Sequence, residues 1–219
     1  MYKITTLTTR DVKNPTPANT FFWQEDKTDH LALILPGLNY TCDMPLLYYA
    51  AQLMLATGAD VLQVKYDYTK NPQGKPFSLD DMEAQLRKDV TDIAKMALEQ
   101  RKYQYLTIIA KSLGTLAVPH LLQADLPLHP NTCVYLTPIL NELVPKKELI
   151  QTCLKNLFVI GTNDHYYDPG LIRELINSQG DNFMIIDGVN HSLEFPGDPL
   201  ASLRVVDEVA RRLETILKI

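Results

Sequence analysis

The chain has 219 residues, of which 46% are hydrophobic and 21% are charged. This balance is typical of a water-soluble globular protein, and the length predicts one α/β domain over residues 1–219. The net charge is −5 and the sequence has no basic block, so nucleic acid is not an expected partner.

The N-terminal segment has no apolar region of the kind found in a signal peptide, and no apolar run is long enough to span a bilayer. We therefore expect a cytoplasmic protein that has no membrane partner. Residues 4–9 predict a strand and residues 20–24 predict its partner, and both are expected to be edge strands. Residues 31–36 instead form a nearly continuous apolar run, typical of a strand buried on both faces.

Five later segments have the same apolar character and predict further buried strands: 59–64, 105–110, 132–137, 157–161 and 182–186. The segments between them have helical periodicity. The clearest helix is 79–99, where Ser78 and Asp81 predict an N-terminal capping box. Its apolar stripe is Met82, Leu86, Val90, Ile93 and Ala97.

The last helix is predicted to begin at Asp198–Pro199, a cap followed by a proline. Its predicted stripe is Leu203, Val206, Ala210, Leu213 and Leu217. Buried strands that alternate with amphipathic helices predict a parallel sheet covered on both faces. The C-terminal ends of parallel strands meet at one edge, where ligands bind in such folds.

The motif AKSLGT follows the strand at 105–110 and places Ser112 between a strand and a helix beginning near Leu113. A sharp strand-to-helix turn needs small residues two positions before and two positions after the serine. Here these residues are Ala110 and Gly114, which gives the nucleophile-elbow pattern G-x-S-x-G with alanine first.

The segment Pro-Gly-Leu-Asn-Tyr at 36–40 follows the first buried strand. Acyl transfer needs donors aimed at the developing oxyanion, and the backbone N–H groups of Leu38 and Leu113 are the candidates. Gly37 would let the backbone approach a ligand closely. The alternative interpretation of this segment is a simple turn that ends a strand.

Two further polar residues follow the late strands: Asp164 after 157–161, and His191 after 182–186. The order Ser112, Asp164, His191 is that of the α/β-hydrolase catalytic triad. His191 would take the serine proton as general base and return it to the leaving group. Asp164 would fix the imidazole tautomer and stabilise its charged form.

Other residues could compete for these roles. His165 follows the correct strand, but it is adjacent to Asp164 and would leave the last loop without a base. Asp168 and Asp187 are alternative acids near the same edge. The other histidines are predicted to lie at the wrong edge or within a helix: His30, His129 and His120.

These motifs resemble the α/β-hydrolase superfamily, near its small lidless, dienelactone-hydrolase-like members, from LPGLNY at 35–40 to the last helix. The chain departs from the pattern at Ala110, which is still small. The resemblance implies a three-layer α/β/α sandwich with about eight mostly parallel strands, and hydrolysis without a cofactor or metal. The fold does not identify a substrate, because it hosts many chemistries.

Several tyrosines are predicted in the loops of this edge. We expect Tyr40, Tyr66 and Tyr166, with Gly37, to bind substrate; simple loop packing is the alternative. Residues 138–156 hold enough chain for a crossover with a helix at 146–154 but not for a lid domain. Cys42, Cys133 and Cys153 lack metal-site spacing and are expected to be reduced.

The sequence therefore predicts a serine hydrolase that cleaves a small ester, thioester or related acyl compound through an acyl-enzyme. A hydrolase-fold protein that binds a ligand or partner without turnover is the alternative from another class. A peptidase or acyltransferase would use the same three residues. The sequence predicts either a monomer or a homodimer.

Overall fold

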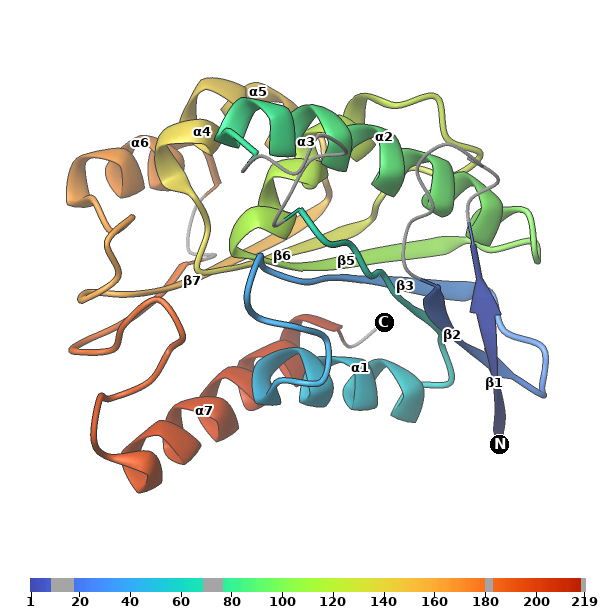
Figure 1. The fold of residues 1–219 in the computed structure, drawn as a ribbon, viewed down its shortest axis with the longest axis horizontal. Coiled ribbons are helices and arrows are strands. Elements are labelled where there is room, and N and C mark those ends of the chain that lie inside the picture. The colour runs from blue at the N-terminus through green and yellow to red at the C-terminus, as the bar shows by residue number, and fades with distance from the viewer. Residues whose placement is uncertain (9–17, 69–76, 180–182, 218–219) are drawn as a thin grey trace.

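The computed structural model describes residues 1–8, 18–68, 77–179 and 183–217. Each predicted apolar run forms a strand, and the strands build one eight-stranded sheet (Figure 1). The expectation that the run at 182–186 is buried is wrong, because its strand lies at the edge of the sheet and Ile185 is 43% exposed. The strands are β1 (Tyr2–Leu7), β2 (Asn19–Gln24), β3 (His30–Leu35), β4 (Asp60–Gln63), β5 (Tyr105–Lys111), β6 (Thr132–Leu136), β7 (Lys155–Gly161) and β8 (Phe183–Ile186). Thr9, the last residue of the first predicted strand, lies outside the described residues.

The strand order is β1-β2-β4-β3-β5-β6-β7-β8. Strands β3 to β8 run parallel, whereas β1 and β2 pair antiparallel with their neighbours. The expectation that both early strands lie at the edge is wrong for β2. It pairs with β1 on one side and β4 on the other, and Phe21 from this strand is fully buried.

Helices cover both faces of the sheet, which confirms the three-layer prediction (Figure 1). One layer holds α2 (Leu79–Leu98), α3 (Ala117–Gln123), α4 (Leu140–Leu143), α5 (Lys147–Ile150) and α6 (Pro169–Gln179). The other layer holds α1 (Pro45–Ala56) and α7 (Pro199–Leu217). Each layer encloses its own apolar core against the sheet. The three cysteines are buried and free, as expected.

Helix α2 begins as its sequence predicts. The Ser78 hydroxyl accepts a hydrogen bond from the Asp81 N–H at 3.1 Å, and the Asp81 carboxylate accepts from the Ser78 N–H. Such a box satisfies backbone donors that the first helical turn leaves unpaired. Most of the predicted stripe is buried; Met82 at its N-terminal end is only partly buried.

The predicted stripe of α7 is wrong in its first half. Its buried residues are Val205, Val209, Leu213 and Leu217. Leu203 is 59% exposed, whereas Val205, two residues later, is 4% exposed. Successive helical residues are about 100° apart, so these two side chains lie on nearly opposite faces of α7, and the face of Val205 is the one that packs on the core.

Residues 137–154, which the structure describes throughout, connect β6 to β7 with α4, a 3-10 turn at Val144–Lys146 and α5. The predicted helix over 146–154 is too long, because α5 ends at Ile150. The Asn156 side-chain amide donates to the carbonyl groups of Ile150 and Cys153, so the chain turns there instead of continuing the helix. This connection contains no lid helices, as expected.

Candidate active site

Ser112 lies in a sharp turn where β5 gives way to helical structure. Its φ is 48°, a backbone conformation that non-glycine residues rarely adopt. A 3-10 turn begins at Ser112 itself, and α3 follows at Ala117. A Cβ atom at Gly114 would lie 2.6 Å from the carbonyl oxygens of Leu35 and Pro36. Glycine at 114 therefore lets the elbow pack directly on the end of β3.

His191 connects the serine hydroxyl to a carboxylate. Its Nε2 atom lies 2.8 Å from Ser112 Oγ, and its Nδ1 atom lies 2.8 Å from Asp164 Oδ2. With the ring proton on Nδ1, the imidazole donates to Asp164 and accepts from Ser112. The structure thus brings together the three residues that the sequence selected, from the ends of β5, β7 and β8.

The Asp164 side chain is fully buried, and its second oxygen is also occupied. Oδ1 accepts a hydrogen bond from the Tyr166 N–H at 2.9 Å, which fixes the carboxylate plane. The loops after β7 and β8 lie in direct backbone contact: the Asn163 N–H donates to the Val189 carbonyl at 3.0 Å. A Cβ atom at Gly161 would lie 2.1 Å from that carbonyl oxygen, so glycine permits the contact that aligns acid and base.

The structure gives the two competing carboxylates other partners. Asp168 Oδ1 accepts from the backbone N–H groups of Gly170 and Leu171 at 2.6 and 3.2 Å, in the first turn of α6. Asp187 Oδ1 accepts from the Thr162 hydroxyl at 2.8 Å. Both carboxylates therefore hold loops at this edge, and Asp164 is the one that bonds His191.

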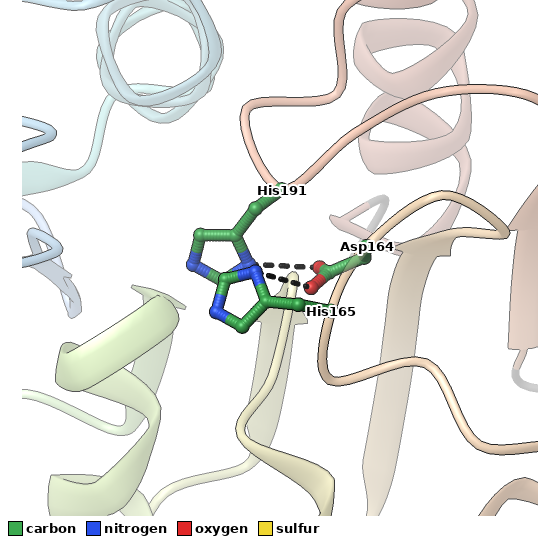
Figure 2. Close-up of side chains that lie close together, drawn as sticks. All are labelled: Asp164, His165 and His191. Atoms are coloured by element: carbon green, nitrogen blue, oxygen red, sulfur yellow. Dashed lines mark hydrogen bonds and ion pairs between the residues drawn. The ribbon is translucent and has the colours of Figure 1, made fainter.

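The histidines that are alternatives to His191 as the base, all of them among the described residues, form no hydrogen bond with Ser112. The His165 ring lies 4.7 Å from the His191 ring, and its Nδ1 atom is 3.7 Å from Asp164 Oδ1 (Figure 2). His30, at the start of β3, contacts Thr107 of β5, and burial lowers the pKa of His30 to about 4. His120 pairs with Glu83 between α3 and α2. His129 is exposed in the loop before β6.

Ser112 and His191 open into a pocket of about 340 Å³. The predicted oxyanion donors Leu38 and Leu113 both line it. Its apolar wall includes Leu79 and Met82 from α2 and Ile139 after β6, which sequence reasoning missed because they are distant along the chain. The full lining is Gly37, Leu38, Asn39, Tyr40, Leu79, Met82, Lys111, Ser112, Leu113, Ile139, His165, Tyr166, His191 and Ser192.

The tyrosines predicted to bind substrate separate into two groups. Tyr40 and Tyr166 line the pocket, as does Gly37. Tyr66 is not part of the lining: its hydroxyl donates to the Pro36 carbonyl, and its ring stacks on Tyr68 with centroids 5.0 Å apart. The structure therefore gives Tyr66 the loop-packing position that the sequence left as the alternative.

Lys111, directly before the nucleophile, was missed by sequence reasoning. Its ammonium group donates to the Thr137 hydroxyl at 2.6 Å and to the His191 carbonyl at 2.8 Å, and it lies 4.6 Å from the Tyr40 ring. Burial lowers the pKa of Lys111 to about 7, against the opposing attraction of Asp164 and Glu194. A single lysine at the end of an apolar run was the signal that could have identified it.

Replacing Lys111 should change how stability depends on pH. The unfolded chain holds this proton up to about its usual pKa of 10.5, whereas the folded chain releases it near pH 7. The folded state therefore binds fewer protons between these values, so this residue makes stability rise with pH there. From pH 7 to pH 9 the wild type should gain about 2 kcal/mol relative to Lys111→Met. Urea unfolding of both proteins measures this difference, and parallel pH curves would contradict it.

Along 1–8, 18–68, 77–179 and 183–217, no helix combines the length and apolar character needed to cross a membrane. No protein-family model and no curated protein matches the sequence.

Several solved structures have a fold similar to that of this chain. A lidless α/β serine hydrolase from Xanthomonas campestris is 13% identical, with a TM-score of 0.65; the match covers 99% of this chain and 97% of that one. Dienelactone hydrolase from Anabaena variabilis is 13% identical over 99% of both chains, with a TM-score of 0.67. Est1E from Butyrivibrio proteoclasticus, solved with ferulic acid bound, is 10% identical, with a TM-score of 0.69; the match covers 96% of this chain and 99% of that one.

Proposed function

We propose that this chain, which has the α/β-hydrolase fold, is a serine hydrolase that cleaves small esters, thioesters or related acyl compounds. The observation that carries the proposal is the hydrogen-bonded series from Ser112 through His191 to the buried Asp164, open to one pocket. A serine hydroxyl is a weak nucleophile until a base can take its proton, and this arrangement supplies the base.

The reaction would proceed in two halves. His191 Nε2 takes the proton as Ser112 Oγ attacks the acyl carbon, and the backbone N–H groups of Leu38 and Leu113 stabilise the oxyanion. His191 then gives the proton to the leaving group, which departs and leaves an acyl-enzyme. Water, activated by the same imidazole, hydrolyses this ester and restores Ser112. The residues need no cofactor or metal for these steps.

The surroundings of the series support turnover rather than simple binding. Both oxygens of Asp164 have donors, and the ring of His191 is in contact with Tyr166 at 5.4 Å between centroids. A base held on two sides can shuttle a proton without being reoriented at each step. Among similar structures, the Xanthomonas protein is described as a serine hydrolase without a lid. We infer a cytoplasmic enzyme with a small-molecule partner.

The pocket and the short β6–β7 connection suggest small acyl groups. Burial of a CH₂ group contributes about 0.8 kcal/mol when it is complete, but a long chain would extend beyond a pocket of about 340 Å³ into water. We expect kcat/KM for 4-nitrophenyl esters to be highest from acetate to butyrate. The polar segment at 70–78, which the sequence predicts to be too short to form an apolar wall, lies mostly outside the described residues.

The measurement is a series of 4-nitrophenyl esters from acetate to dodecanoate, with Ser112→Ala as the blank. Values that rise steadily beyond butyrate would reveal an acyl tunnel and overturn the size argument. A series in which no ester is cleaved faster than the blank would overturn the proposed function itself.

A further inference from the structure

Two residues of the proposed triad and the neighbouring His165 form a cluster of side chains with metal-binding atoms. Asp164, His165 and His191 each offer one such atom, and these atoms all lie within 4.8 Å of one another. Figure 2 shows both imidazole rings directed at the same carboxylate, each with one nitrogen facing an oxygen. Asp164 and His165 come from the loop after β7, and His191 comes from the loop after β8.

The distances suit one zinc ion. Zinc binds imidazole nitrogen and carboxylate oxygen at about 2.0–2.2 Å, so two tetrahedral ligands lie about 3.3 Å apart. His191 Nδ1 is 2.8 Å from Asp164 Oδ2, and His165 Nδ1 is 3.7 Å from Asp164 Oδ1. These two separations, each to a different oxygen of the carboxylate, lie on either side of the ideal value. The ligand atoms of all three residues lie within 4.8 Å of one another, so rotation of the side chains would bring them onto one ion.

The three side chains differ in burial, so the proposed site has a buried ligand and a side that is open to solvent. The Asp164 side chain is completely buried, that of His191 is 25% exposed, and that of His165 is 64% exposed. A buried carboxylate provides the charge that attracts a cation, and the exposed His165 can close over it from the solvent side. Three protein ligands with a fourth position left for water is a common arrangement for zinc.

We propose that Asp164, His165 and His191 form a zinc site that switches the triad off. Zinc would take the place of the proton between His191 Nδ1 and Asp164. That proton leaves to solvent, and Nε2 takes one up, so the imidazole stays neutral with its single proton on Nε2. Nε2 then has no lone pair to accept the Ser112 proton, and the serine is no longer activated.

The binding half of this proposal is independent of the reaction; the inhibition half rests on the proposed hydrolase function. Binding is therefore tested on full-length Ser112→Ala after removal of metal with a chelator. Titration calorimetry with ZnCl₂ should show one zinc per chain. Adding His165→Gln should weaken the affinity at least about tenfold, since even the loss of an outer-shell partner of a metal ligand costs 10- to 100-fold.

His129→Gln is the matched control, because it removes another exposed histidine, in the loop before β6. It should leave zinc affinity unchanged. The site is overturned by equal binding in the protein with His165→Gln, by an equal loss in the His129→Gln control, or by no stoichiometric binding at all.

Inhibition is tested on the wild-type chain through the rate at which a fluorophosphonate labels Ser112. One equivalent of bound zinc should suppress labelling, and EDTA should restore it. Relative to its own zinc-free rate, His165→Gln should need at least about tenfold more zinc for half-suppression. Zinc that binds without slowing the labelling overturns the switch. If the zinc-free wild type neither reacts with the probe nor cleaves esters, the hydrolase function fails, while calorimetry still decides the metal site.

Discussion

Ser112→Ala should lower ester turnover by on the order of 10⁶-fold, the scale seen when the nucleophile of a serine protease is removed. The reason is that the substitution deletes the atom that attacks the acyl carbon and leaves His191 with no proton to accept. The variant removes one oxygen from a partly exposed side chain, so the fold should be retained. Turnover is measured with 4-nitrophenyl acetate, and folding by circular dichroism.

The same variant decides which atom is the nucleophile. Mass spectrometry should find one fluorophosphonate adduct on the wild type, localised to the peptide that contains Ser112, and none on Ser112→Ala. An adduct on another residue of the folded wild type, or a Ser112→Ala protein that remains active, would show that the nucleophile has been misassigned.

Asp164→Asn should lower kcat/KM by on the order of 10⁴-fold, the effect of the equivalent change in well-studied triads. Asparagine is nearly the same size, but its amide can present an N–H to Nδ1 of His191. The ring would then carry its proton on Nε2, where it cannot accept from Ser112. Ester hydrolysis and the rate of fluorophosphonate labelling should fall together.

Asp168→Asn is the matched control, because it makes the same chemical change four residues further along the chain. Its carboxylate accepts backbone N–H groups at the start of α6, a position at which asparagine serves about equally well. The loss in kcat/KM should therefore be less than about tenfold, since Asp168 does not bond the base. If Asp168→Asn is the crippling change and Asp164→Asn is mild, the acid has been misassigned.

The strands and the three aligned residues could be predicted because their signals are local. An apolar run of five or six residues predicts a strand from local sequence alone, and parallel strands bring their C-terminal ends to one edge. Ser112, Asp164 and His191 each lie within five residues of the end of such a run. Placing them at one edge therefore required only the order of the strands along the chain.

What could not be predicted depends on contacts between distant segments. The position of α7 against the sheet determines that Val205 is buried and Leu203 is exposed, although both are apolar. The role of the Tyr66 hydroxyl depends on the Pro36 carbonyl, 30 residues earlier. In both cases the sequence around one segment holds no signal of the distant segment that it contacts.

The Lys111 ammonium has a consequence for how the protein becomes active during folding. It joins the end of β5 to Thr137, 26 residues later, and to the loop of His191, 80 residues later. Closing a contact over so long a stretch of chain costs conformational entropy, and the pairing of β3 with β5, where His30 lies beside Tyr105, carries a similar cost. Recovery of catalysis in a refolding chain should therefore report that both the central strand pairing and the loop of His191 are in place. Ester turnover followed beside circular dichroism during refolding measures whether the two are restored together.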